Sequence, residues 1–278
     1  MYYCMIFNQM KDKVIIITGA SSGIGKALAY EFGANQAKVV LAARDITNLN
    51  AIISDLQSLG VQAIAVRTDV TSENDCRILI EKTIEEFGKI DILINNAGIS
   101  MRALFIDLKL DVMRRLMDTN YWGTVYCTKF AMPYLLKTSG SLVGVISIGG
   151  YIGMPGRSAY AASKFAVRGF LDTIRVENRK TRLHVLVVAP GFTTSNIRRA
   201  ALLADGTLQG ETPRDESHMM PAEEVAARVY NAVKKRKRQL VLTFWEGKLT
   251  VFLGKFLPKF LDKLIYNTFA KEPDSPLK

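Results

Sequence analysis

Short apolar runs alternate with longer amphipathic segments along most of the chain, and this alternation restricts the fold more than any other feature. Runs rich in Val and Ile and apolar throughout are typical of strands buried on both faces of a parallel sheet. The predicted strands are 13–18, 38–43, 62–67, 90–95, 141–146, 184–189 and 239–244. The predicted helices are 23–33, 48–59, 72–87, 107–137, 158–181 and 221–236.

Strand–helix alternation predicts an α/β fold, a doubly wound Rossmann-type parallel sheet of about seven strands with helices on both faces. The chain has 278 residues, which suits one large domain. We expect a leader over 1–11, the main domain over 12–245 and an extension over 246–278. Residues 192–220 lack sustained periodicity, and a connection of that length is typical of a lid or a binding loop.

The net charge of +11 is unevenly distributed. From Lys234 to Lys278 there are eleven Lys and Arg against four Asp and Glu, so this part carries +7 and the rest +4. The main domain therefore has no strong basic signal for nucleic acid. Three cysteines are scattered without CxxC spacing and only two histidines occur, so we expect no metal and a reducing, cytoplasmic location. No apolar run approaches the ~20 residues that cross a bilayer.

Three glycines, Gly19, Gly23 and Gly25, lie between the first predicted strand and the first predicted helix. Absent side chains permit a tight turn and let a phosphate approach the backbone, while the helix N-terminus offers free N–H groups and partial positive charge. A glycine cluster alone also occurs in ordinary turns. Its position at the first strand–helix junction favours a nucleotide site.

The second predicted strand ends in the sequence VVLAARD, which bears on the choice of cofactor. Folds that bind NAD usually end this strand with an acidic residue for the ribose 2′-hydroxyl. Here Ala43 occupies that place and Arg44 follows, and arginine suits a 2′-phosphate. The sequence thus favours NADP(H). Asp45, one residue later, leaves NAD(H) as the alternative.

Several motifs in this order, spread over 12–245, resemble the short-chain dehydrogenase/reductase family of the YxxxK type. They are TGASSGIG at 18–25, DV at 69–70, NNAG at 95–98, the Tyr–Lys pair and PG at 190–191. The resemblance implies hydride transfer between a nicotinamide cofactor and a carbonyl or secondary alcohol. Together with Arg44, the implied cofactor contacts are Gly19, Ser21, Ser22, Gly23, Ile24, Gly25, Asp69, Val70, Asn96, Ala97, Gly98, Tyr160, Lys164, Pro190, Gly191, Thr193, Thr194 and Ser195.

The resemblance places four catalytic residues at Asn120, Ser147, Tyr160 and Lys164. Ser147 follows the predicted strand 141–146, hence the ligand edge of the sheet, and Lys164 lies one helical turn beyond Tyr160. We expect the lysine cation and the oxidised cofactor to lower the pKa of the tyrosine, which then acts as general acid and base. Ser147 would orient the substrate oxygen. By the resemblance, Lys164 also binds the nicotinamide ribose and Asn120 holds a water of a proton relay.

Some residues depart from the family pattern. Ser147 has no serine neighbour, Ser195 stands where a threonine is usual, and Ser22 replaces the basic residue that many NADP users carry. His184 begins a buried strand and is interpreted as structural, whereas His218 lies in the 192–220 loop without a recognisable partner. Neither histidine supports a Ser–His–Asp hydrolase.

Apolar residues near the predicted site indicate an apolar, lipid-like or steroid-like substrate. Those expected to form its wall are Tyr151, Ile152, Met154, Phe192 and Ile197. Three functions remain open: an NADP(H)-dependent carbonyl reductase or alcohol dehydrogenase, a 3-oxoacyl-thioester reductase of lipid synthesis, and a non-catalytic dinucleotide-binding regulator or scaffold. The first is favoured over the last because the catalytic set is complete.

The extension predicts a basic amphipathic helix that Pro258 divides in two. Its basic side carries Lys248, Lys255, Lys259 and Lys263. Its apolar side carries Leu249, Leu253, Phe256, Leu257, Phe260, Leu261 and Leu264. Such a helix can lie on an anionic membrane through 246–270, or its apolar side can cover the pocket or a partner subunit. We also expect a homo-oligomer, a dimer or a tetramer.

Overall fold

The computed structural model describes residues 10–212, 219–272 and 275–277. Seven parallel strands form one sheet in the order β3-β2-β1-β4-β5-β6-β7. The strands are β1 (Val14–Thr18), β2 (Lys38–Ala43), β3 (Ala63–Arg67), β4 (Ile92–Asn95), β5 (Ser141–Val145), β6 (His184–Ala189) and β7 (Gln239–Val241). The predicted doubly wound Rossmann-type sheet is confirmed, with every predicted strand in place. Most of the expected leader and His218 lie outside the described residues.

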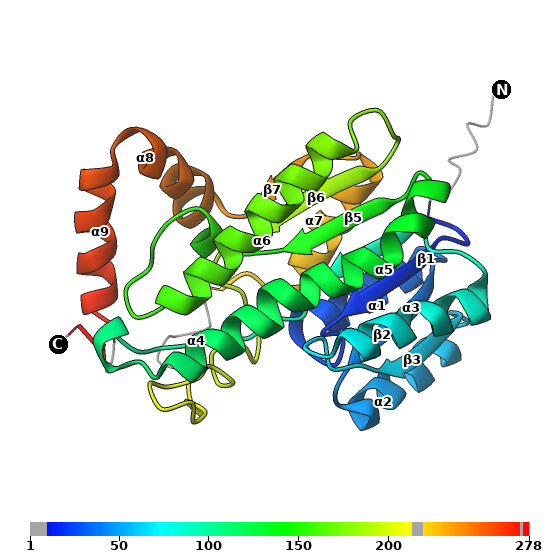
Figure 1. The fold of residues 1–278 in the computed structure, drawn as a ribbon, viewed down its shortest axis with the longest axis horizontal. Coiled ribbons are helices and arrows are strands. Elements are labelled where there is room, and N and C mark those ends of the chain that lie inside the picture. Colours follow the sequence, from blue (N-terminus) through cyan, green and yellow to red (C-terminus); the bar gives the residue numbers. More distant parts are fainter. Residues whose placement is uncertain (1–9, 213–218, 273–274, 278) are drawn as a thin grey trace.

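Helices cover both faces of the sheet, as Figure 1 shows. One face carries α1 (Gly23–Ala34), α2 (Ile46–Ser58) and α7 (Ala222–Lys234). The other carries α3 (Glu73–Phe87), α5 (Gly123–Lys137) and α6 (Ser158–Glu177). Along β1 the side chains alternate between the two cores: Ile15 packs in the first and Ile16 in the second, both fully buried. This two-sided burial explains the continuous apolar runs.

The predicted single helix over 107–137 is wrong. The chain forms a 3₁₀ turn (Phe105–Asp107), then α4 (Leu110–Met117), a π-helical turn (Asp118–Trp122) and α5. The wide turn places Asn120 inward, where its side chain accepts from the backbone N–H of Ile99 at 2.8 Å and donates to the carbonyl of Ile99 at 3.0 Å. These bonds join the helix to the segment after β4, and π turns often occur at such functional positions.

The predicted last strand, 239–244, is shorter than expected because the backbone leaves the sheet after β7. Thr243 has φ +64°, and a π-helical turn (Phe244–Leu249) follows. Two helices come next, α8 (Thr250–Phe256) and α9 (Pro258–Ala270). The predicted break at Pro258 is confirmed, since the proline occupies the first turn of α9, where its missing N–H needs no partner.

The C-terminal helices stand along one side of the molecule, at the left of Figure 1. In the described part of 192–220 the backbone forms only isolated bridges, such as the pair Met101 and Leu202. The described helices include none with the length and apolar character to cross a bilayer.

Candidate active site

A cavity of about 430 Å³ lies between the carboxyl ends of the strands and the C-terminal helices. Segments after three parallel strands line it: Asn96 after β4, Ser147 after β5 and Pro190 after β6. This is the edge at which open α/β sheets bind ligands. Of the predicted site residues, those that line the cavity are Ile24, Asn96, Gly98, Ser147, Tyr160, Lys164, Pro190, Gly191, Thr193 and Ser195.

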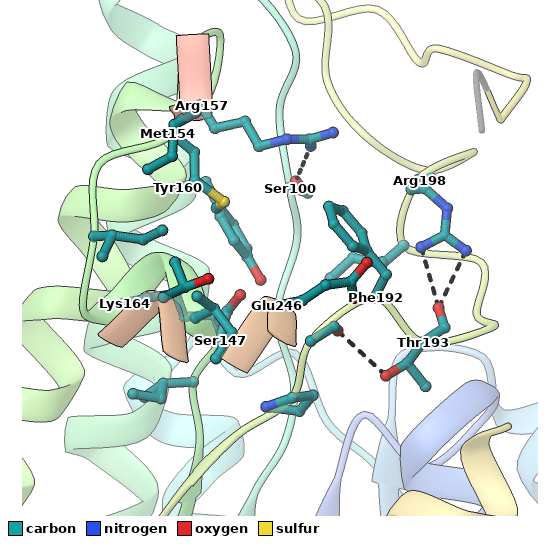
Figure 2. Close-up of a pocket in the computed structure, with 18 of the residues that line it drawn as sticks. Ser100, Ser147, Met154, Arg157, Tyr160, Lys164, Phe192, Thr193, Arg198 and Glu246 are labelled. Atoms are coloured by element: carbon teal, nitrogen blue, oxygen red, sulfur yellow. Dashed lines mark hydrogen bonds between the residues drawn. The ribbon is translucent and has the colours of Figure 1, made fainter. Parts of the chain in front are cut away.

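Ser147 and Tyr160 meet in this cavity, and Figure 2 shows their side chains pointing toward one another. Ser147 caps a 3₁₀ turn (Ile148–Gly150), where its hydroxyl accepts from the N–H of Gly149 at 3.1 Å. The turn fixes the serine directly after β5. Tyr160, in the first turn of α6, presents its hydroxyl to that of Ser147. Two hydroxyl groups from different elements thus face one position in the cavity.

Lys164 lies one turn beyond Tyr160 on α6, with its Nζ 5.8 Å from the centre of the tyrosine ring. The Nζ donates to the carbonyl of Val145 at 3.0 Å. Burial disfavours the ammonium ion and lowers the pKa of Lys164 from 10.5 to about 8. The expected cation beside the phenol is therefore present and is held by the end of β5.

The protein's own groups move the pKa of Tyr160 upward, and the lowering expected from Lys164 and the oxidised cofactor together stays a prediction. Burial raises the pKa, because a phenolate is poorly solvated inside the protein. The Ser147 hydroxyl beside the phenol and the charge of Arg157 lower the pKa, and burial outweighs both. The protein's own groups therefore keep Tyr160 protonated at neutral pH, the form that donates a proton.

Asn120 lies behind the cavity wall and not on it. Its amide nitrogen donates to Ser163 Oγ at 2.8 Å, and Ser163 Oγ donates to the carbonyl of Tyr160 at 2.7 Å. A Cβ atom at Gly98 would lie 3.1 Å from Asn120 Oδ1 and 3.2 Å from Lys164 Nζ. The glycine thus leaves the space between these two groups open, at the place where the expected water relay would run.

The turn after β1 fits a bound phosphate. Gly19 has φ +64°, and Asn96 donates from its side chain to the carbonyls of Thr18 and Gly19 at 2.9 and 3.2 Å. A Cβ at Gly25 would collide with the carbonyl oxygen of Gly19. Only glycines allow the turn to fold this closely over the start of α1, where free N–H groups attract an anion. Ser21, Ser22 and Gly23 complete the same turn and lie outside the cavity.

The ends of β2 and β3 place the remaining predicted cofactor residues. Arg44 is exposed, and in the described part of the chain it forms no ion pair. Asp45 instead caps α2, accepting from the N–H of Asn48 at 3.0 Å. Asp69 accepts from the N–H of Thr71 at 3.0 Å. Val70 is buried in the second core and does not line the cavity. Ala97, which follows β4, packs against the same core and does not line the cavity either.

The segment after β6 folds back through Arg198, which is buried. Its guanidinium donates twice to the carbonyl of Thr193, each bond 3.1 Å long, as drawn in Figure 2. Thr193 and Ser195 line the cavity, whereas Thr194 lies outside it and bonds to Met220. The hydroxyl that replaces the usual threonine is therefore correctly placed beside the cavity.

Comparison with known proteins identifies this arrangement. The sequence model described as short chain dehydrogenase matches residues 13–204, more than half of the chain. The chain belongs to the short-chain dehydrogenase/reductase family. It is therefore an oxidoreductase that acts on CH–OH or C=O groups with a nicotinamide cofactor.

The sequence similarity to known proteins extends over nearly the whole chain of this dehydrogenase. "Dehydrogenase/reductase SDR family member 7B" of Rattus norvegicus is 34% identical over 96% of this chain and 84% of its own. "11-beta-hydroxysteroid dehydrogenase-like 4A" of Arabidopsis thaliana is 35% identical over 93% of this chain and 85% of its own. The fold resembles a crystal structure of a short-chain dehydrogenase/reductase from Burkholderia phymatum in complex with NAD, with a TM-score of 0.76 and 24% identity over 84% and 89% of the two chains.

The substrate side of this dehydrogenase follows the prediction in part. Ile152, Met154, Phe192 and Ile197 line the cavity. The expectation is wrong for Tyr151, whose ring packs 3.9 Å from the Arg168 guanidinium and against the second core. Tyr151 directly follows the 3₁₀ turn and so belongs to no periodic face, and the sequence could not show which way it points.

Sequence reasoning missed several residues of the short-chain dehydrogenase site. Arg157 lies at the start of α6, is buried, and donates to Ser100 Oγ and to the carbonyl of Met101, both at 3.2 Å. Glu246 also lines the cavity. Arg157 precedes Tyr160 by three residues, and that adjacency was the one available signal. The burial of Arg157 arises from contacts between distant segments.

His184 hydrogen-bonds through both ring nitrogens, to Ser141 Oγ at 2.9 Å and to the carbonyl of Lys237 at 2.8 Å. It begins β6, at the end of the strand away from the cavity, and its structural role is confirmed. Among the described residues of this dehydrogenase, no group of His, Cys, Asp and Glu is arranged to hold a metal ion.

Proposed function

We propose that the protein is an NADP(H)-dependent oxidoreductase of apolar carbonyl and secondary alcohol substrates, with Tyr160 as general acid and base. The observation that carries the proposal is the pairing of the Tyr160 and Ser147 hydroxyls in a largely apolar cavity beside the glycine turn. Lys164 adds the cation, one helical turn away.

The nicotinamide ring, when bound, gives or accepts the hydride. In reduction, the substrate oxygen lies within reach of both hydroxyls, and Ser147 donates a hydrogen bond that orients it. Tyr160 transfers its hydroxyl proton to that oxygen as negative charge develops there. Lys164 stabilises the phenolate that remains and holds the ribose hydroxyls. Asn120 supports a water that returns a proton to this chain of groups. Oxidation of the alcohol uses the same steps in reverse.

The preference for NADP(H) rests on Arg44 and Asp45. The carboxylate of Asp45 is engaged in capping α2, and the exposed Arg44 is available for a 2′-phosphate. Fluorescence titration of Arg44→Ala should show NADPH binding weakened about tenfold or more, with NADH binding unchanged. Arg67→Ala is the matched control, because Arg67 is paired with Ala43 across β2 and β3 and is also exposed. Equal affinity of the wild type for both cofactors, or tighter NADH binding, would refute the preference.

The substrate class rests on the apolar lining contributed by Ile152, Met154 and Phe192 and by the C-terminal helices. The similar Arabidopsis thaliana protein carries the name of a hydroxysteroid dehydrogenase, which supports a steroid-like or lipid-like substrate. A panel of ketosteroids, aliphatic ketones, aldehydes and 3-oxoacyl thioesters, followed by NADPH oxidation, tests this. Highest kcat/KM on a 3-oxoacyl thioester would favour the alternative function in lipid synthesis.

Replacement of Tyr160 by Phe tests the mechanism. We expect kcat to fall by about 10³-fold or more, with the NADPH dissociation constant within twofold of wild type. Tyr134→Phe is the control and should leave both constants unchanged, because Tyr134 is half-buried near the end of α5 and does not line the cavity. An unaffected rate in Tyr160→Phe would refute the general acid. Tight cofactor binding without turnover of any panel compound would indicate a regulator or scaffold instead.

We also propose a homo-oligomer that forms through α5 and α6 and acts in the cytoplasm. These helices leave large apolar side chains exposed, among them Leu136 and Phe165, and Trp122 stacks on Tyr126 at their edge. Light scattering should give the mass of a dimer or tetramer, and Phe165→Glu should shift it toward the monomer. A monomeric wild type at micromolar concentration would refute the assembly.

A further inference from the structure

The two C-terminal helices are apolar on two sides, and only one side faces the cavity. Leu253 of α8 and Leu261, Ile265 and Phe269 of α9 line it. The other side carries Phe252, Phe256, Leu257 and Phe260, each between 54 and 58% exposed. We call these four side chains the outer tail face. The predicted apolar side is therefore divided, part covering the pocket and part open to solvent.

Lysines are interspersed in the sequence with the residues of the outer tail face. Lys248, Lys255, Lys259 and Lys263 are all exposed, and the acidic residues between 244 and 271 are Glu246 and Asp262. Lys255 Nζ lies 5.3 Å from the centre of the Phe256 ring, and the rings of Phe252 and Phe256 lie 4.7 Å apart. Exposed aromatic groups among lysines are the composition of a surface that binds at an anionic lipid interface.

The mouth of the cavity opens beside the outer tail face. Trp245 lines the cavity and is nevertheless 74% exposed, and Leu264 lines it and is 47% exposed. Side chains that belong to both the cavity and the surface mark its rim. Trp245 precedes α8 and Leu264 belongs to α9, so the rim and the outer tail face are built from the same short stretch of chain.

We propose that the outer tail face docks on an anionic lipid bilayer, with the rim of the cavity turned toward the lipid. The aromatic and leucine side chains enter the interfacial region, while the lysine ammonium groups contact anionic headgroups. A second copy of this chain is the other conceivable occupant. A two-fold interface would place equivalent patches together, and here that would set lysines against lysines. The charge therefore favours the anionic surface, and the docking stands independently of the substrate.

Co-sedimentation of the full-length protein with vesicles tests the docking. Phosphatidylcholine vesicles containing about 30% phosphatidylserine should bind the protein, and vesicles of phosphatidylcholine alone should bind it far less. Lys255→Gln/Lys259→Gln should lower the partition coefficient about tenfold or more. Lys235→Gln/Lys237→Gln removes the same charge at the end of α7 and should lower it less than threefold.

A second pair of variants tests the apolar contribution. Phe256→Ser/Phe260→Ser should lose vesicle binding while retaining NADPH binding and turnover of a water-soluble ketone, since neither side chain lines the cavity. Phe105→Ser/Ile106→Ser removes two apolar side chains before α4 that are more exposed still, and this variant should bind vesicles as the wild type does. Circular dichroism establishes that α8 and α9 remain folded in each variant.

Tryptophan fluorescence reports the orientation. The chain has two tryptophans, so Trp122→Phe leaves Trp245 as the single reporter. Its emission should shift to the blue on anionic vesicles and be quenched by brominated lipid. The proposal is overturned if both lysine pairs reduce binding equally, if phosphatidylcholine alone binds as well, or if Trp245 stays in water. It is also overturned if Phe256→Ser/Phe260→Ser lowers the oligomer mass, because a second copy would then occupy the face.

Discussion

Replacement of Gly19 by Ala gives the most direct test of the cofactor turn. Gly19 has φ +64°, a conformation that a residue with a Cβ atom adopts at an energetic cost. The added Cβ would also lie 2.8 Å from Ala97 Cα and 3.1 Å from Ala97 N. Both neighbours are backbone atoms of the segment after β4, so a side-chain rotation cannot relieve the contact.

The expected loss of stability has two parts. The left-handed backbone costs alanine about 1–2 kcal/mol, and crowding in a packed region costs about 1–3 kcal/mol more. Gly60 separates these parts. It has φ +79°, and a Cβ atom added there would meet no other atom within 4 Å. Gly60→Ala should therefore cost about 1–2 kcal/mol only. Because both variants change the unfolded chain alike, their difference of about 1–3 kcal/mol isolates the crowding.

Two assays read the effect. Urea denaturation gives the free energy of unfolding of wild type, Gly19→Ala and Gly60→Ala, and NADPH fluorescence gives the dissociation constants. The contact at Gly19 must move the turn away from Asn96, which bonds to the carbonyls of Thr18 and Gly19. We expect the NADPH dissociation constant of Gly19→Ala to rise about tenfold or more, or ~1.4 kcal/mol, and that of Gly60→Ala to stay at the wild-type value.

One result would refute this reasoning: Gly19→Ala as stable as Gly60→Ala, with NADPH bound as tightly as by wild type. Such a result would mean that the backbone after β4 moves away from the added Cβ at no energetic cost. The close contact between Gly19 and Ala97 would then not be needed for the phosphate site. Weaker cofactor binding with unchanged stability would place the effect on the ligand alone, and would contradict the crowding argument as well.

Three further predictions concern the site and its support. Ser147→Ala should lower kcat about 10²-fold without weakening NADPH binding. The control Ser158→Ala, at the start of α6, should leave kcat within twofold of wild type. Equal rates in the two variants would show that Ser147 takes no part in the mechanism. In cofactor-free protein, burial lowers the pKa of Lys164 from 10.5 to about 8, so the unfolded chain binds more protons across this window and stability rises with pH. Lys164→Met should remove roughly 3 kcal/mol of the rise in the free energy of unfolding between the folded and the unfolded pKa of the lysine. Curves of unfolding free energy against pH that run parallel for wild type and variant would contradict this. Asp91 is buried, and its carboxylate lies 2.8 Å from Lys13 Nζ and 2.9 Å from Lys89 Nζ. Burial alone would raise the pKa of this carboxyl, but the hydrogen bonds from Lys13, the Val14 N–H and Lys89 outweigh burial and lower the pKa below 3.8. Stability is therefore present above that value and is lost as pH falls through the folded pKa, and Asp91→Asn should lose about 1–3 kcal/mol at neutral pH with a weaker acid dependence, measured by urea denaturation.

Much of the site followed from local sequence. Parallel strands end at one edge of the sheet, so residues directly after them come together whatever the loops do. Ser147 and Asn96 were located in this way, and Lys164 followed from helical spacing to Tyr160. Asp45 shows the limit of such reasoning. Its residue type is compatible with a ribose contact or a helix cap, and only the hydrogen bond to Asn48 decided for the cap.

The sequence by itself determined the seven-stranded sheet, the glycine turn, the Tyr–Lys pair and the break at Pro258. Each depends on periodicity or on backbone chemistry within a few residues. The tertiary structure alone decided the wide turn at Asn120, the burial of Arg157 and Arg198, the raised pKa of Tyr160 and the division of the tail into a pocket side and an outer face. These properties depend on which distant segments exclude water from a group, and no local pattern of residues encodes that.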